Sequence, residues 1–174
     1  MRKLVKEEEY AKLARKLRRL HPYDISELLQ KFNKSLRDKI LLNLPNDMLI
    51  ELIPEFPEEM QSEFVEILSP QMAANLLASI SPDDMADVLG DLALDTRKKI
   101  VGYFSKEKVR EASSLLKHPR DTAGGLMTTE VVSLNKDMLV GKAMEYVRKE
   151  AEEYETVYYI YVVDDDGKLV GVLS

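Results

Sequence analysis

Prolines recur through the middle of the chain at intervals that match one short helix and its turn. The intervals are 12, 13 and 12 residues, and they separate Pro45, Pro57, Pro70 and Pro82. Proline is favoured at the first position of a helix, where its missing N–H leaves no hydrogen bond unmade. Further 12-residue steps reach Leu94 and Lys106, where Asp95 and Ser105 are the expected helix starts. The pattern therefore predicts a series of short helices, each opened at a fixed interval.

Capping residues support these helix starts. Ser69 and Ser81 stand directly before Pro70 and Pro82, where a serine can cap the helix, and Ser81 with Asp84 approximates a capping box. Helices this short are marginal alone and must stack on their neighbours. Together with apolar residues at helical spacing, this predicts helices across residues 24–116. The fold class is mainly α, a right-handed superhelix of short paired helices (an α-solenoid) with about 25 residues per repeat.

Charge is distributed very unevenly along the chain. Residues 1–20 carry a net charge of +5, and the other 154 residues carry −11. Residues 7–20 predict a basic amphipathic helix with an apolar stripe of Leu13, Leu17 and Leu20. This helix is either a solvated terminal helix or a contact for an acidic partner.

No Lys or Arg occurs between Lys39 and Arg97, an interval with twelve carboxylates in 57 residues. Such a surface repels nucleic acid and attracts cations or a basic partner. Its densest part follows Pro82. At about 100° per residue, the four aspartates that follow Pro82 fall within one arc of about 100°, opposite an apolar stripe; they are Asp83, Asp84, Asp87 and Asp91.

Two interpretations of these four aspartates stay open. The first is a solvated helix face. The second is a divalent-cation surface, because like charges at i and i+4 destabilise their own helix and a hard cation would relieve them. Mg²⁺ fits the second, since it prefers oxygen ligands, keeps several waters and needs only one or two carboxylates.

The chain changes character after residue 117. His118-Pro119 is expected to end the last helix. Strands are predicted over residues 131–134, 156–163 and 169–173, and a helix over residues 139–151. The order is β-α-β-β and no closing helix follows, which predicts an incomplete α/β module. The expected domains are residues 1–20, 21–117, 118–129 as linker, and 130–174.

Several function classes are disfavoured. The chain has no cysteine, which removes disulfides and thiolate chemistry and agrees with a reducing, cytosolic compartment. No run of about 18 apolar residues predicts a membrane span. The two histidines, His21 and His118, both precede prolines, and no nucleophile-base pair or phosphate loop stands out. We therefore expect no enzyme activity.

Local motifs make the chain resemble the cytosolic part of MgtE-type magnesium transporters and channels. Ala-Gly-Gly-Leu-Met-Thr at 123–128 and Asp-Gly-Lys-Leu-Val-Gly-Val-Leu-Ser at 166–174 are similar to a cystathionine-β-synthase (CBS) motif. His-Pro-x-Asp-Ile-x-x-Leu-Leu at 21–29 and Asp-Asp-Met-Ala-Asp-Val-Leu at 83–89 resemble the family's helical domain.

The resemblance implies a regulatory role on the cytoplasmic side of a membrane. In that family, Mg²⁺ bridges acidic surfaces between the helical domain and a CBS pair, often in a homodimer, and holds a pore closed. It implies Asp83, Asp84, Asp87 and Asp91 as ligands, adds Glu51 from Leu-Pro-x-x-x-x-x-Glu at 44–51, and adds the carbonyl of Gly125. The partners would be the second CBS motif and the transmembrane domain, which this sequence lacks.

Two other function classes remain as alternatives. One is an acidic interaction scaffold, since the middle domain of the flagellar switch protein FliG has a similar helical-repeat fold. The other is an adenine-nucleotide sensor of the CBS type. The family's ribose-binding Ser/Thr-x-x-Asp would begin at Ser174 and the chain ends before its Asp, so nucleotide binding by this chain is not expected.

Overall fold

The computed structural model describes residues 9–150 and 158–174. The chain divides into two compact units, the first ending at Leu126 and the second beginning at Met127. The predictions for residues 7–8, 151 and 156–157 lie outside the described residues. Among the helices of the described ranges, none combines the length and the apolar character that crossing a membrane requires.

Short helices form the first unit, as the proline spacing predicts. Each has between 7 and 11 residues. In chain order they are α2 (Tyr10–Leu17), α3 (Pro22–Gln30), α4 (Lys34–Leu41), α5 (Asn46–Leu52), α6 (Glu58–Ile67), α7 (Pro70–Leu77), α8 (Pro82–Asp91), α9 (Leu94–Val101) and α10 (Lys106–Leu116).

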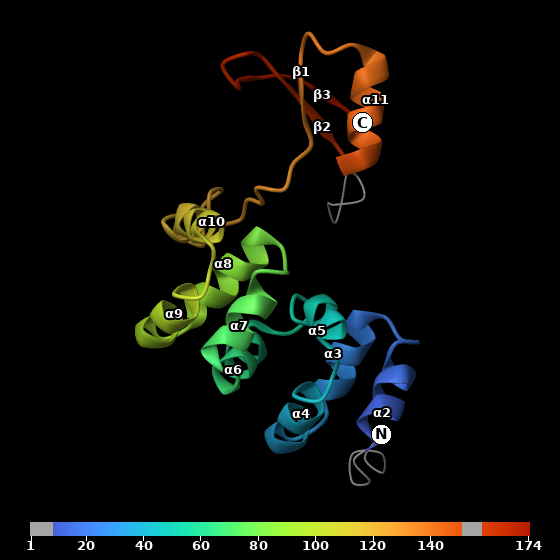
Figure 1. Ribbon diagram of the computed structural model, residues 1–174, viewed down its shortest axis with the longest axis vertical. Coiled ribbons are helices and arrows are strands. Elements are labelled where there is room, and N and C mark those ends of the chain that lie inside the picture. The colour runs from blue at the N-terminus through green and yellow to red at the C-terminus, as the bar shows by residue number, and fades with distance from the viewer. Residues whose placement is uncertain (1–8, 151–157) are drawn as a thin grey trace. The chain divides into compact units, whose positions relative to one another are not determined.

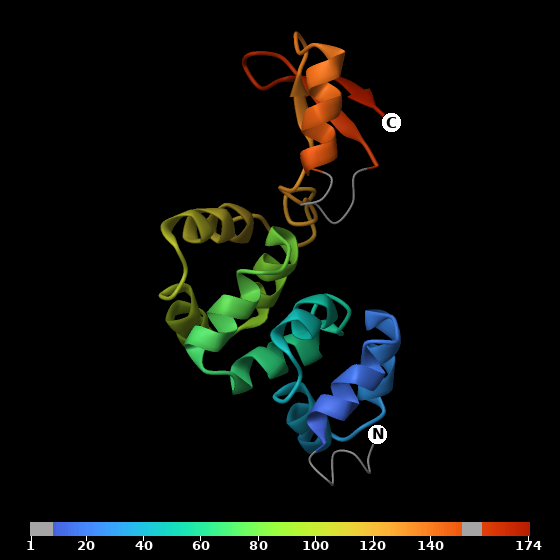
Figure 2. The same cartoon turned by 45° about the vertical axis from the view of Figure 1, so that its right-hand side comes forward.

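Most of these helices pack mainly on the next but one. The odd-numbered helices α3, α5, α7 and α9 contact one another in succession, and α6, α8 and α10 do the same. Figures 1 and 2 show the resulting winding stack from α2 to α10. Two alternating rows of helices are the arrangement of an α-solenoid, so the predicted fold class is confirmed.

One continuous apolar core runs through this stack, from Leu13 in α2 to Ala112 in α10. Its largest fully buried side chains include Phe64, Ile53 and Met85. Leu20, expected in the apolar stripe of the first helix, is instead 43% exposed. The reason is that α2 ends at Leu17, so Leu20 lies beyond the helical face that the core covers.

Two of the prolines do not take the position that the repeat suggests. Pro70 and Pro82 are the first residues of α7 and α8, each behind a capping serine. Pro45 and Pro57 lie one position earlier, as the residues before α5 and α6. Their extended backbone fits that position, because a residue at the N-cap has non-helical dihedral angles.

The second unit is a small α/β module made of β1 (Ser133–Asn135), α11 (Val140–Glu150), β2 (Ile160–Val163) and β3 (Leu169–Leu173). The strand order is β1-β2-β3, with β1 parallel to β2 and β2 antiparallel to β3. The predicted β-α-β-β order is confirmed. β1 begins later than expected, although the Val132 carbonyl still accepts from the Tyr161 N–H at 2.9 Å.

The Asp-Asp-Asp-Gly segment between β2 and β3 is a structural turn. The Asp164 carboxylate accepts the backbone N–H groups of Asp166 and Lys168 at 3.1 and 2.9 Å. Gly167 has a φ of +76°, which favours glycine. Because the Asp164 carboxylate is hydrogen-bonded to the backbone of its own turn, this acidic segment stabilises the hairpin between β2 and β3.

Candidate metal-binding site

Helix α8 turns its acidic face away from the core. The Ser81 hydroxyl accepts the Asp84 N–H at 3.3 Å and so caps the helix. The buried residues of α8 include Met85, Val88 and Leu89. Because these buried positions follow the helical period, the aspartates lie on the remaining arc. Asp83 and Asp84 are half-buried there, whereas Asp87 and Asp91 are exposed.

The predicted capping box is present in altered form. The Ser81 hydroxyl donates to Asp84 Oδ2 at 2.6 Å, so the return contact goes to the hydroxyl rather than to the backbone N–H. Asp is one methylene shorter than the usual Glu and makes the nearer contact. Burial raises the pKa of Asp84, the Ser81 hydrogen bond opposes that rise, and Asp83 adds to it.

Asp83 has a different environment. Its Oδ1 atom is buried and has no hydrogen-bond partner in the described part of the protein. A buried carboxylate oxygen without a donor is unfavourable. Asp83 is therefore the aspartate of α8 with the most to gain from a bound cation or water.

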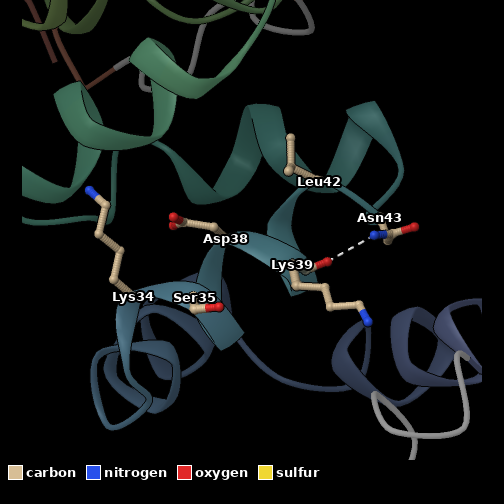
Figure 3. Close-up of a pocket in the computed structure, with 6 residues that line it drawn as sticks. All are labelled: Lys34, Ser35, Asp38, Lys39, Leu42 and Asn43. Carbon is tan, nitrogen blue, oxygen red and sulfur yellow. Dashed lines mark hydrogen bonds between the residues drawn. The ribbon is translucent and has the colours of Figure 1, made fainter.

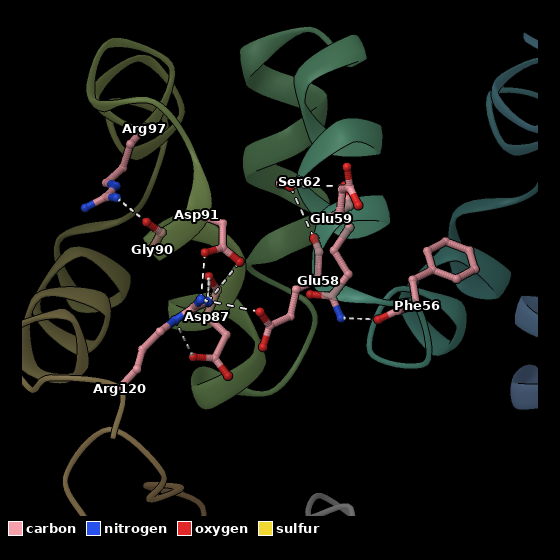
Figure 4. A network of polar contacts seen from close by, with 10 residues as sticks. Phe56, Glu58, Glu59, Ser62, Asp87, Gly90, Asp91, Arg97 and Arg120 are labelled. Carbon is pink, nitrogen blue, oxygen red and sulfur yellow. Dashed lines mark hydrogen bonds and ion pairs between the residues drawn. The ribbon is translucent and has the colours of Figure 1, made fainter. Parts of the chain in front are cut away.

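Arg120 reaches the other two aspartates, and sequence reasoning did not identify it. Its guanidinium donates to both oxygens of Asp91, at 2.6 and 2.9 Å, and to the Asp87 carbonyl oxygen at 2.8 Å. Its Nε lies 3.7 Å from Asp87 Oδ1, and its Nη1 lies 3.6 Å from Glu58 Oε2. Figure 4 shows these carboxylates gathered around one guanidinium.

A tight loop after α10 presents Arg120. Thr122 donates its backbone N–H and its hydroxyl to the Pro119 carbonyl, at 3.1 and 2.7 Å. A Cβ atom on Gly125 would lie 2.3 Å from that carbonyl oxygen and 2.7 Å from the Arg120 Cα. Only glycine fits at such a distance. Gly125, predicted as a carbonyl ligand, thus has a structural reason to be glycine.

Glu58, rather than Glu51, joins the carboxylates of α8. Glu58 opens α6, which packs against α8. Glu51 is exposed on α5, whose main partners are α3 and α7. The signal that could have found Glu58 is the solenoid itself, because helices two apart are neighbours and the residue after Pro57 opens such a helix.

Other carboxylates of the acidic interval are paired with cations from outside it. Arg18 contacts Asp47 at 2.6 Å, and Lys34 and Arg37 contact Glu63 at 2.9 and 2.7 Å. The hydrogen bonds from Arg18 and Lys34 are the main reasons why the pKa values of Asp47 and Glu63 are lowered.

On α8, by contrast, the pKa of Asp87 is raised rather than lowered. Burial raises the pKa of Asp87, Arg120 opposes this, and the carboxylates of Glu58, Asp84 and Asp83 add to the rise. Besides Asp87, four carboxylates surround this region: Glu58, Asp83, Asp84 and Asp91. Arg120 is the guanidinium that faces them, and it is hydrogen-bonded to Asp91. The acidic face of α8 therefore keeps an excess of negative charge that Arg120 does not neutralise.

No group of three metal-ligating side chains lies ready-made among residues 9–150 and 158–174. The carboxylates of Asp87, Asp91 and Glu58 gather around Arg120, whereas Asp83 and Asp84 lie in the first turn of α8. This arrangement suits a hydrated Mg²⁺ that takes one or two carboxylates, with other ligands from a facing surface.

Two hollows elsewhere differ in chemistry. One, of 580 Å³, is open along α4 between residues such as Lys34, Asp38 and Asn43 (Figure 3). Within it, Asn43 donates to the Lys39 carbonyl at 2.9 Å, and Lys34 is already paired with Glu63. The other, of 230 Å³, lies in the second unit between α11 and the sheet, and its lining includes Val140, Met144 and Ile160.

Comparison with known proteins assigns both units. Residues 20–121 match the family model of the MgtE intracellular N domain, and residues 123–174 match that of the CBS domain. A stretch of 85 residues is 41% identical to the magnesium transporter MgtE of Thermus thermophilus, covering 45% of this chain and 19% of that protein. Another of 68 residues is 44% identical to MgtE of Enterococcus faecalis, covering 39% and 15%. The matches thus span only a small part of these relatives.

Solved structures agree with this assignment. The soluble part of a magnesium transporter superposes with a TM-score of 0.84 at 29% identity, covering 99% of this chain and 68% of that one. The cytosolic domain of the Mg²⁺ channel MgtE, in complex with ATP, gives 0.89 at 31% identity, covering 99% and 71%. With its helical solenoid and its CBS module both matched, this chain belongs to the MgtE family of magnesium transporters.

Proposed function

We propose that this chain is the Mg²⁺-sensing regulatory part of an MgtE transporter, on the cytoplasmic side of the membrane. Mg²⁺ occupies the acidic face of α8 and links it to an opposing surface of the CBS region or of a second protomer. The ligands are drawn from Asp83, Asp84, Asp87 and Asp91. Glu51 and the Gly125 carbonyl contribute where the opposing surface brings them within reach. The transporter's transmembrane part responds to this linkage.

The excess of negative charge on α8 is the observation that carries the proposal. The raised pKa of Asp87 means that its charged form is held at a cost in free energy. A divalent cation near Asp87 reduces that cost more than a monovalent one, because its attraction to each carboxylate is doubled. When Mg²⁺ is scarce, the same charge favours separation of the surfaces, and this couples ion concentration to conformation.

Thermal unfolding tests the proposal. The chain is unfolded in EDTA, in millimolar MgCl₂, and in NaCl of matched ionic strength. Specific binding raises the unfolding free energy by about 2.7 kcal/mol when the ion exceeds its Kd 100-fold. We expect Mg²⁺ to raise the midpoint beyond matched NaCl, and the Asp83→Asn/Asp87→Asn variant to lose that gain.

A matched control removes two negative charges from α3, whose main partner is α5. Asp24 and Glu27 are exposed on α3, so Asp24→Asn/Glu27→Gln changes the net charge equally. This variant should keep the full Mg²⁺ gain. If MgCl₂ and NaCl shift the unfolding midpoint of the unsubstituted chain equally, the acidic face responds only to ionic screening. That result would favour the interaction scaffold over a Mg²⁺ site.

Adenine-nucleotide binding by the second unit is a second candidate. One observation favours it: the solved MgtE cytosolic domain similar to this chain is a complex with ATP. The apolar hollow between α11 and the sheet offers an adenine ring a surface to pack on. Isothermal titration calorimetry with ATP tests this candidate in the unsubstituted chain and in Ala143→Trp, whose larger side chain fills the hollow. Binding in the hollow predicts heat of binding for the unsubstituted chain and its loss in the variant.

A further inference from the structure

We infer that Arg120 is an internal counter-ion of the acidic face of α8, which Mg²⁺ must displace, and that it thereby raises the Mg²⁺ concentration at which the face is occupied. The inference rests on the proposed function and deepens it, because it assigns a residue that tunes the same surface.

The same oxygen atoms would serve both cations. The guanidinium uses both carboxylate oxygens of Asp91, at 2.6 and 2.9 Å, and adds the Asp87 carbonyl at 2.8 Å. Its planar fork matches a carboxylate in bidentate geometry. The two N–H groups take one lone pair on each Asp91 oxygen and hold a positive charge against the carboxylate. A Mg²⁺ ion at the same carboxylate is repelled by that charge, so Mg²⁺ binding to Asp91 competes with the Arg120 fork.

Charge makes this competition persistent. Arginine keeps its proton at every relevant pH, and the contact with Asp91 raises the pKa of Arg120 further. The three carboxylates around it, Glu58, Asp87 and Asp91, carry −3 and the guanidinium brings the sum to −2. A divalent cation that replaces Arg120 brings it to −1. Mg²⁺ thus neutralises more of the carboxylate charge than Arg120 does, but Arg120 is present at every Mg²⁺ concentration.

Exchange between the two cations is feasible because Arg120 is held at the surface. Its side chain is 45% exposed, and exposed ion pairs contribute little net stability. Its backbone is fixed, however. The Pro119 carbonyl accepts from Thr122, and Gly125 packs against it too closely for any larger residue. The loop therefore returns the guanidinium to α8 whenever the metal leaves, and only the side chain has to move.

Three variants of the whole chain test this competition, with MgCl₂ as the probe. Arg120→Gln removes the charge and the fork, and Arg120→Lys keeps the charge without the fork. Lys117→Gln removes the same charge from an exposed position three residues away. Each is titrated with MgCl₂ at constant ionic strength. The rise of the thermal unfolding midpoint with Mg²⁺ concentration is fitted to the binding equation, which gives the half-saturating Mg²⁺ concentration.

We expect Arg120→Gln to lower the half-saturating concentration by about two- to fivefold, the range that follows from loss of one exposed ion pair. Arg120→Lys should give a smaller decrease, and Lys117→Gln the smallest. A Mg²⁺ response that appears only after Arg120→Gln would support the inference in its strongest form.

Two results separate the inference from the function on which it rests. If the unsubstituted chain responds to Mg²⁺ and Arg120→Gln shifts the response no more than Lys117→Gln, the internal counter-ion is refuted and the proposed function stands. If neither the unsubstituted chain nor Arg120→Gln responds beyond matched NaCl, both fail.

Discussion

The aspartates of α8 share one helix face but differ in what they contact. Asp84 receives the Ser81 hydroxyl, Asp91 receives Arg120, and Asp83 keeps a buried oxygen without a described partner. Helical periodicity predicts the shared face. It does not predict Arg120, which lies 29 residues beyond Asp91 and reaches it only through the loop after α10. Local spacing carries no information about such a contact.

At the residue scale, Asp87 gives a prediction about pH. The raised pKa means that the folded state binds the proton more tightly than the unfolded state, so the charged carboxylate lowers stability above the folded-state pKa. This penalty disappears as the pH falls through that pKa. In EDTA at neutral pH, Asp87→Asn should therefore be slightly more stable than the unsubstituted chain, by less than about 1 kcal/mol because the side chain is exposed.

The measurement is urea unfolding in EDTA between neutral pH and about pH 4, which is close to the unperturbed pKa of aspartate. The advantage of Asp87→Asn should shrink as the pH is lowered, whereas Glu27→Gln should show no such trend. A variant that is less stable than the unsubstituted chain at neutral pH would mean that the attraction of Asp87 to Arg120 outweighs burial.

Gly125 gives a second residue-scale prediction. A Cβ at this position would lie 2.3 Å from the Pro119 carbonyl oxygen, so Gly125→Ala must rearrange the loop and withdraw Arg120 from α8. We expect a loss of roughly 1–3 kcal/mol. Gly141→Ala is the control, since that Cβ would meet nothing within 4 Å and alanine favours the helix by about 1 kcal/mol. Thermal unfolding of both variants measures the difference. Equal unfolding midpoints for Gly125→Ala and Gly141→Ala would show that a Cβ at position 125 causes no strain.

At the scale of elements, the proline interval is the most productive sequence signal. It predicts the helices and their stacking, and the structure confirms both. It misplaces Pro45 and Pro57 by one position, because the same residue suits both the N-cap and the first helical position. It also overlooks Glu58, whose nearness to α8 comes from the packing of alternate helices rather than from sequence neighbours.

The cap of α8 can be tested at this scale. Ser81→Ala removes the acceptor for the Asp84 N–H and the donor to the Asp84 carboxylate. Loss of a serine cap destabilises a helix by about 1 kcal/mol. Because the lost hydrogen bond also held the pKa of Asp84 down, that pKa should rise further, which NMR titration of the carboxyl carbon would measure.

The control for this cap is Ser79→Ala, whose hydroxyl donates only to the Asn75 carbonyl on the exposed side of α7. It should leave both stability and the Asp84 titration nearly unchanged. If Ser81→Ala behaves like Ser79→Ala, the capping interaction contributes no stability to α8.

At the scale of the whole molecule, the two units differ in how completely they bury their apolar side chains. The solenoid has one core that continues through its helices. In the described part of the second unit, Val132 and Leu134 are the buried hydrophobic residues, while Val140, Met144 and Val172 are at least half exposed. The sequence predicts this imbalance, since β-α-β-β provides one helix for a sheet with two faces.

Exposed apolar surface on both α11 and the sheet leads to a prediction about association. Val140 and Met144 lie on α11, beside the apolar hollow, with 79% and 51% of their surface exposed. A second copy of the chain would remove that surface from water, at about 25 cal/mol per Å². We therefore expect sedimentation equilibrium to give an average mass that rises with concentration above the 19.9 kDa of one chain.

The variant Met144→Glu places a charge on this surface and should restore the mass of one chain at every concentration, because a buried carboxylate without a partner opposes association. Leu94→Glu is the matched control: Leu94 is 67% exposed on α9 of the solenoid, so the same added charge should leave self-association intact. The opposite pattern, with Leu94→Glu abolishing association and Met144→Glu not, would place the contact on the solenoid. A mass of 19.9 kDa at all concentrations would mean that the exposed surface of the second unit is too small or too irregular to hold two chains together.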